Sequence, residues 1–206
     1  MEEVLTRKRL TREESRAQTR ERLLDSALNV FVKDGVESAS IEDVAEAAGY
    51  SRGAFYSNFE SKDDLLCAVL DRELERENRE VEALVTAIPP AELIDKLREY
   101  YVEMARDENH CAFWLGLQLH SIRNEAIRPR MAELMRKKRE HVIAQVRRVY
   151  AAIGKETPGS AETVALGLIT IAQGLSITRA LDPEAIAGDL LPRALETLFN
   201  QITGTA

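Results

Sequence analysis

The feature that most constrains the fold is the spacing of the apolar residues, which recur every three or four positions through most of the sequence. Leu24, Ala27, Leu28 and Phe31, for example, lie at i, i+3, i+4 and i+7, the pattern of one helical face. No stretch shows the alternation of apolar and polar residues that marks a half-buried strand. With only 10 Gly and 6 Pro in 206 residues, long helices are favoured. We therefore expect an all-α fold.

Capping signals mark where the first helices begin and end. The segment 11–14, TREE, has the Thr-x-x-Glu form of a capping box, which predicts the start of a first helix. Gly35 is expected to end this helix, because glycine readily adopts the left-handed conformation found at helix C-termini. Ser40 is the expected N-cap of a second, short helix that ends near Gly49. After a three-residue turn, Ser51 caps a third helix.

A much longer fourth helix is expected to begin at Ser61 and to stop at Pro89-Pro90. Helical spacing continues beyond it. Pro129 either lies in the first turn of a later helix or kinks that helix, and the spacing leaves both open. Residues 161–180 are apolar on more than one face, which predicts a helix buried on several sides.

Composition narrows the class of protein. The net charge of -7 argues against a surface coated in basic residues for indiscriminate binding of nucleic acid. Cys67 and Cys111 lie far apart without a CxxC motif, and His110, Cys111 and His120 have poor spacing for a metal site, so we expect neither a disulfide framework nor a metal or other cofactor. No apolar run is expected to span a membrane. The two isolated cysteines fit a location in the reducing cytoplasm best.

Two short helices joined by a tight glycine-containing turn, at about residues 40–59, predict a helix-turn-helix. In this motif the first helix braces the second, so that the N-terminal end of the second can enter the major groove of DNA. The segment 51–62, SRGAFYSNFESK, offers small residues for close approach together with a guanidinium, a phenol, an amide and a lysine. Phe55 and Phe59 lie four apart on one side and are expected in the core.

The segment 40–66, SIEDVAEAAGYSRGAFYSNFESKDDLL, resembles the DNA-binding signature of the TetR family of bacterial transcriptional regulators, and the preceding ALNVFVKDG resembles the first helix of that family. The resemblance covers about residues 15–75. Beyond it, length, helix number and the segment AQGLSITRALDPEAI are similar to the ligand-binding and dimerisation domain of the family. The family resemblance implies a helix-turn-helix domain over residues 11–60 and a larger helical domain over residues 61–206.

The resemblance also implies roles for individual residues. Phosphates would be contacted by Ser40, Ser51, Tyr56 and Lys62, and bases would be approached by Arg52, Gly53, Ala54, Ser57 and Asn58. Three simpler roles stay open: Tyr56 packing on the first helix, Arg52 as a solvated surface charge, and Lys62 as an ordinary lysine near a helix cap. The N-terminal residues Arg7, Lys8, Arg9 and Arg12 are either a solvated tail or an arm for the minor groove.

Aromatic and soft apolar side chains with a few polar groups in the second domain are candidates for a small-molecule pocket, although such stripes are more often core. The candidates are Tyr100, Tyr101, Met104, Phe113, Trp114, Leu117, Gln118, His120 and Gln173. The basic run 136–139 is interpreted as the exposed face of a helix.

Together these features favour a cytoplasmic repressor, associated with the nucleoid when bound to DNA. It would act as a homodimer on a palindromic operator and be released by a small-molecule ligand, although ligand-promoted binding stays open. Dimerisation is expected through residues 161–181 and 189–203, the latter carrying Leu191, Leu195, Leu198 and Ile202 at helical spacing. The alternatives are a helical protein-interaction module and an all-α enzyme, although no catalytic motif is evident.

Overall fold

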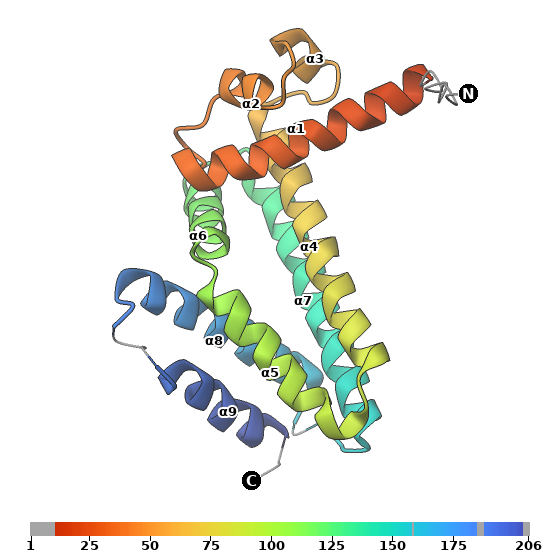
Figure 1. Ribbon diagram of the computed structural model, residues 1–206, viewed down its shortest axis with the longest axis vertical. Helices are drawn as coiled ribbons and strands as arrows, with labels where there is room; N and C mark the ends of the chain where they lie inside the picture. The colour runs from red at the N-terminus through yellow and green to blue at the C-terminus, as the bar shows by residue number, and fades with distance from the viewer. Residues whose placement is uncertain (1–10, 158, 185–187, 204–206) are drawn as a thin grey trace, which may run out of the picture. The chain divides into compact units, whose positions relative to one another are not determined.

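The computed structural model describes residues 11–157, 159–184 and 188–203, without side chains for 198–203. Within these ranges it contains nine α-helices and no strand, which confirms the expected all-α fold (Figure 1). The chain divides into two compact units, the first ending at Val69 and the second beginning at Leu70. The boundary expected from the sequence lies after residue 60. The first unit extends further because it includes the start of the fourth helix, where Leu65, Leu66 and Val69 are buried.

The first unit consists of α1 (Arg12–Asp34), α2 (Ile41–Ala47), α3 (Arg52–Tyr56) and the beginning of α4 (Lys62–Ala87). The predicted capping box is present, because Thr11 Oγ1 accepts a hydrogen bond from the Glu14 amide at 3.1 Å and Glu14 Oε2 accepts one from the Thr11 amide at 2.7 Å. Ser40 forms a second capping box with Asp43.

The helix-turn-helix depends on a turn that only glycine enters easily. Gly49 has a φ of +74°, in the left-handed region, which lets the chain reverse between α2 and α3. Ser51 then caps α3 by accepting a hydrogen bond from the Ala54 amide at 3.2 Å. Phe55 and Phe59 are 0% and 2% exposed, and their rings lie 5.7 Å apart, so both belong to the core as expected.

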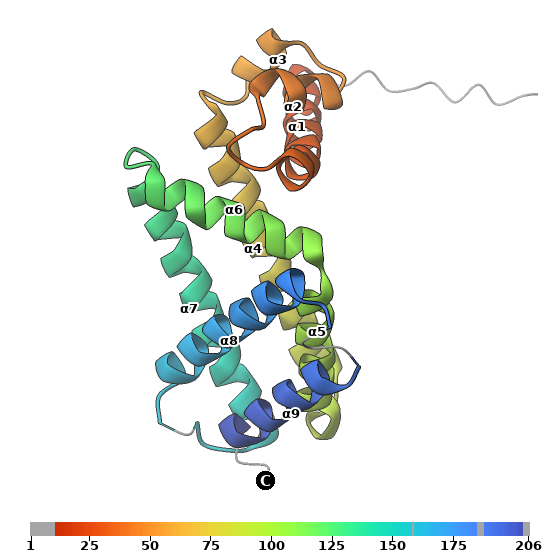
Figure 2. The same ribbon diagram turned by 90° about the vertical axis from the view of Figure 1, so that its left-hand side faces the viewer.

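The second unit continues along α4 and contains five further helices (Figure 2). These are α5 (Pro90–Arg106), α6 (Glu108–Arg123), α7 (Arg128–Ile153), α8 (Ala161–Leu181) and α9 (Leu190–Thr203). Pro129 lies in the first turn of α7, which decides the alternative left open by the sequence. α8 packs against α5, α6 and α7, and α9 packs against α5.

Polar contacts tie α4 to α7 inside the second unit. Lys137 Nζ lies 2.8 Å from Asp71 Oδ1, and Arg148 Nη1 lies 2.7 Å from Glu82 Oε1. Gln145 Nε2 donates a hydrogen bond to Asn78 Oδ1 at 3.0 Å. The basic run 136–139 therefore contributes to a helix-helix contact and is not merely a solvated face.

Two expectations for α8 require correction. It was expected to be buried on several sides, yet only 22% of its most apolar 18-residue window is buried, and Leu166 and Leu181 are 58% and 80% exposed. With a mean hydropathy of 1.5 over that window, α8 is also long and apolar enough to cross a membrane, contrary to the expectation that no run would be. Core helices of soluble proteins meet the same criterion, and α8 packs against three helices of its own unit.

Two residues of α9 that were expected at the dimer interface are buried within the chain. Leu191 and Leu195 are 1% and 3% exposed and belong to a core cluster with Leu93 and Leu97 of α5. These two leucines therefore stabilise the single chain and do not lie on its surface. The side chains of Leu198 and Ile202 lie outside the described part of the structure.

Candidate DNA-binding surface and ligand cavity

The N-terminal end of α3 presents an exposed set of residues that includes most of the predicted DNA contacts. Ser51, Arg52, Gly53, Tyr56 and Ser57 are exposed, and Ala54 is partly exposed. Tyr56 is 47% exposed, so it is not packed into the core. Because Phe55 is buried while Arg52, Gly53 and Tyr56 are exposed, α3 has one face in the core and the other in solvent.

Arg52 is held by two neighbours on this surface. Its Nη1 lies 2.7 Å from Oε1 of Glu42 on α2, and its Nη2 donates to the Tyr56 hydroxyl at 3.4 Å. The bond to Tyr56 and the charge of Glu42 raise the pKa of Arg52, so the guanidinium stays charged. Glu42 was not among the predicted site residues. Glu42 lies in the first turn of α2, and its approach to Arg52 at the start of α3 depends on the geometry of the turn between the two helices.

Asn58 and Ser57 use their side chains within the fold. Asn58 Nδ2 donates to the Ala54 carbonyl at 2.9 Å, while the backbone carbonyl of Asn58 accepts from Arg20 Nη1 at 3.0 Å. Ser57 Oγ donates to the Gly53 carbonyl at 3.0 Å. Base contacts by these two residues remain predictions, and they would require these side chains to change partners.

Lys62 has a structural role that the sequence did not indicate. Its Nζ lies 3.1, 3.0 and 3.0 Å from the carbonyl oxygens of Val36, Glu37 and Ala39. An ammonium has three donors, and these three carbonyls use all of them. Lys62 thus ties the start of α4 to the loop before α2. The predicted phosphate contact remains a prediction, and it would require at least one of these bonds to open.

The other predicted contacts lie at helix starts. Ser40 Oγ donates to Asp43 Oδ2 at 2.6 Å, so its hydroxyl is occupied by the cap of α2. Arg12 is exposed at the first position of α1. Arg7, Lys8 and Arg9 lie outside the described residues.

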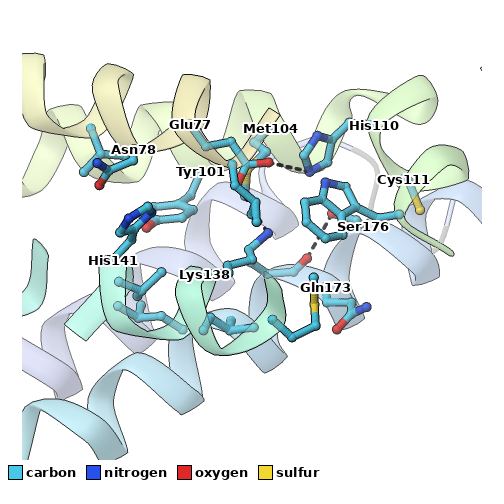
Figure 3. A pocket seen from close by; sticks show the side chains of 18 of the residues that line it. Glu77, Asn78, Tyr101, Met104, His110, Cys111, Lys138, His141, Gln173 and Ser176 are labelled. Carbon is cyan, nitrogen blue, oxygen red and sulfur yellow. Dashed lines mark hydrogen bonds and ion pairs between the residues drawn. The ribbon is translucent and has the colours of Figure 1, made fainter. Parts of the chain in front are cut away.

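The second unit contains a cavity of about 110 Å³ (Figure 3). Of the predicted pocket residues, it is lined by Tyr100, Tyr101, Met104, Trp114, Gln118 and Gln173. Phe113, Leu117 and His120 do not line it, so ligand contacts by these three residues stay predictions. Phe113 and Leu117 are 2% and 0% exposed and belong to the buried core.

Several polar lining residues were missed, most of them on α4 and α7. They are Glu77, Asn78, His110, Lys138, His141, Gln145 and Ser176. A signal for Lys138 was available, because it follows Met131 and Met135 and precedes Val142 at helical spacing, which places it on the apolar face of α7. Glu77 carried the same signal, because it follows Leu70 and Leu74 and precedes Val81 at helical spacing on α4.

Charges inside the cavity are closely paired. Lys138 Nζ lies 3.3 Å from Glu77 Oε2 and 3.7 Å from the centroid of the Trp114 ring. His110 Nε2 lies 3.9 Å from Glu77 Oε1, too far for a hydrogen bond, and this oxygen is buried without a hydrogen-bond partner. Figure 3 shows Glu77, His110 and Lys138 converging from α4, α6 and α7.

Burial shifts the pKa values of the neighbouring groups. It lowers the pKa of His110 below 6.5, so the imidazole is largely neutral at neutral pH. It raises the pKa of Tyr101 to about 12, helped by the charge of Glu77, and it also raises the pKa of Tyr100. The cavity thus combines neutral aromatic rings with one carboxylate and one ammonium.

A helix-turn-helix with an exposed recognition helix, joined to a helical unit that contains a cavity, defines the class of DNA-binding transcriptional regulators. Residues 23–69 match the model of bacterial regulatory proteins of the tetR family. Residues 89–204, more than half of the chain, match the model of the C-terminal region of BetI-type transcriptional repressors. The chain therefore belongs to the TetR family of transcriptional regulators.

Individual relatives agree with this assignment. The regulator AcrR of Shigella flexneri is 37% identical over 97 residues, which cover 47% of this chain and 44% of AcrR. The nicotine-responsive repressor HdnoR of Paenarthrobacter nicotinovorans is 27% identical over 168 residues, which cover 80% of this chain and 84% of HdnoR. A transcriptional regulator from a Rhodococcus species has a solved structure with a TM-score of 0.70 and 25% identity, covering 91% of this chain and 97% of that chain. For AcrR, as for most of the curated relatives compared, the match spans less than half of the relative's own length.

Proposed function

We propose that the chain is a repressor that binds a palindromic DNA operator as a homodimer and is released when a small molecule enters the cavity of the second unit. The observation that carries this proposal is the exposed N-terminal end of α3, with Arg52 at its first position. Arginine at the start of a recognition helix can donate two hydrogen bonds to guanine in the major groove. Regulators of this family bind DNA operators and small-molecule effectors as dimers.

Effector control is supported by the cavity and by α4. This helix runs without interruption from Lys62, in the first unit, to Ala87 and provides Glu77 and Asn78 to the cavity. A ligand that favours one position of α4 would shift the population of DNA-binding conformers. HdnoR is named as responsive to nicotine, which is a precedent among the relatives for control by a small organic molecule. By this proposal the protein works in the cytoplasm, at the nucleoid when bound to DNA.

The apolar surface of α8 supports the homodimer. Leu166 and Leu181 on α8 and Leu190 on α9 are 58%, 80% and 51% exposed. A second copy of the chain would cover these side chains, and a two-fold dimer requires a self-complementary surface of this kind. Leu191 and Leu195 are buried within the single chain. A charged substitution at Leu195 would therefore destabilise the fold of the chain itself and would not be a test of the dimer interface.

Selection of duplexes from random DNA by the full chain tests this function. We expect enrichment of an inverted repeat whose half-sites are separated by about one helical turn, 34–36 Å, or a multiple of it. Arg52→Ala should relax base preference at one position in each half-site at a cost of about 1–3 kcal/mol. Arg106→Ala, on α5 of the second unit, is the matched control and should leave the selected sequence unchanged. Selection of no sequence, or of a site without inverted symmetry, would contradict the proposal.

A further inference from the structure

The ammonium of Lys138 lies inside the cavity, 3.7 Å from the centroid of the Trp114 ring and 3.3 Å from Glu77 Oε2. We propose that this is a binding site for an organic cation, which the chain fills with its own lysine until a ligand cation displaces it. The inference rests on the proposed function, because it names the chemical class of the effector.

The contacts of Lys138 define what the site recognises. The face of an indole ring attracts a cation through the quadrupole of its π-system, and this attraction is strongest when water is excluded. Trp114 is 7% exposed, so its ring provides such a face. Glu77 supplies a carboxylate on the other side of the ammonium. A ligand ammonium placed at the position of Lys138 Nζ would meet the same two groups.

Lys138 is the partner that can leave. Its charge is carried on a flexible four-carbon stem, and its side chain is 20% exposed, so the ammonium can swing into solvent. Glu77 has a shorter stem and a side chain that is 15% exposed. Its Oε1 is already buried without a hydrogen-bond partner. Withdrawal of Lys138 would leave Oε2 unpaired as well, and a buried, unpaired carboxylate is costly unless a cation or hydrogen-bond donor takes the place of the lysine.

His110, Tyr100 and Tyr101 do not provide a second cation to neutralise Glu77. The imidazole of His110 faces Oε1 at 3.9 Å and is kept neutral by burial, which lowers its pKa. Tyr100 and Tyr101 contribute uncharged rings, because burial raises the pKa of both phenols. An anionic ligand would have to approach Lys138 beside Glu77, where two negative charges would repel each other.

Much of the remaining cavity wall is apolar and suits an apolar body on the ligand. The apolar lining includes Met104, Leu168, Ile169, Ala172 and Ile177, beside polar side chains of Asn78, Gln118, Gln145, Gln173 and Ser176. The ligand class is therefore an alkylated or aromatic ammonium compound.

The test uses benzyltrimethylammonium as the probe, with neopentylbenzene as its neutral isostere and phenylacetate as an anion. Binding to the full chain is followed by the fluorescence of Trp114, the single tryptophan in the sequence. We expect the cation to change this fluorescence on binding and to bind at least about tenfold more tightly than either comparison compound. A preference for the neutral compound or the anion, or no binding of the cation, would overturn the inference.

Variants of the two charged residues separate this site from a simple apolar pocket. Lys138→Met removes the internal competitor and should tighten binding of the cation by about threefold or more. Lys138→Gln is the second variant if Met disturbs packing, and Lys137→Met, which removes a lysine that pairs with Asp71 outside the cavity lining, is the matched control and should have no effect. Glu77→Gln should weaken binding by about tenfold. Weaker binding in both Lys138 variants would show that the lysine binds the ligand and would refute the proposal.

Operator binding, measured separately by gel shift, keeps this inference distinguishable from the proposed function. A chain that binds a palindromic duplex but not the cation retains the proposed function and refutes the cation site. A chain that binds the cation with the expected effects of the Lys138 and Glu77 variants, but binds no specific duplex, retains the site and refutes the repressor.

Discussion

Arg52 Nη1 and Glu42 Oε1 lie 2.7 Å apart, so the arginine expected to read a base is paired with a carboxylate from the preceding helix. Both side chains are more than half exposed. An exposed pair of this kind contributes little to stability, because water and salt screen it. The pair instead opposes DNA binding, because Arg52 must separate from Glu42 before it can contact guanine.

Glu42→Gln should therefore strengthen operator binding. The substitution frees Arg52 and removes a negative charge from the DNA-facing surface, for an expected gain of about 0.2–1 kcal/mol. Fluorescence anisotropy of a labelled operator at fixed salt measures it. Glu46→Gln removes the same charge from the same helix and is the control for the general effect of charge. Equal gains in the two variants would indicate that the Arg52 pair has no specific effect.

Lys62→Met should destabilise the first unit. Three backbone carbonyls lose their charged donor, with an expected decrease of about 1–3 kcal/mol in the free energy of unfolding. Urea unfolding of the full chain followed by circular dichroism gives the value, and Lys33→Met on the exposed surface of α1 is the control. Unchanged stability with a lower salt dependence of operator binding would instead favour the phosphate contact implied by the family resemblance.

The imidazole of His110, which is 16% exposed, should make stability depend on pH. Its pKa is lowered in the folded chain, so below its usual value of 6.5 the unfolded chain takes up a proton more readily. The free energy of unfolding should therefore decrease as the pH falls through 6.5 toward the folded pKa. Urea unfolding at about pH 7.5 and about pH 5.5 should show a smaller decrease for His110→Gln than for the unmodified chain. Equal decreases in the two proteins would mean that the pKa of His110 is not lowered by folding.

Leu166→Glu should dissociate the homodimer. Leu166 is 58% exposed on α8, so a charge there leaves the single chain folded but cannot be buried in an interface. Sedimentation at low micromolar concentration should show a monomer, whereas Ala83→Glu on the exposed surface of α4 should stay dimeric. A dimeric Leu166→Glu variant would place the interface elsewhere.

Local sequence signals predicted the helices well because each depends on neighbours a few residues apart. The cap at Thr11 and the stop before Pro90 are of this kind. Contacts between distant segments were not predictable in the same way. Lys62 reaches carbonyls more than twenty residues away, and Lys138 meets Glu77 from another helix. An apolar helix such as α8 also looks the same in sequence whether its own chain or a partner covers it.

The most direct test of the whole account is a measurement of mutual coupling between operator and cavity ligand. The affinity of benzyltrimethylammonium is measured through Trp114 fluorescence with and without the selected operator, and operator affinity is measured with and without the cation. If the ligand releases the repressor, each should weaken the binding of the other by the same factor, because coupling free energies are reciprocal. Simultaneous binding of both, with neither affinity changed, would contradict the claim that the cavity controls the recognition helix.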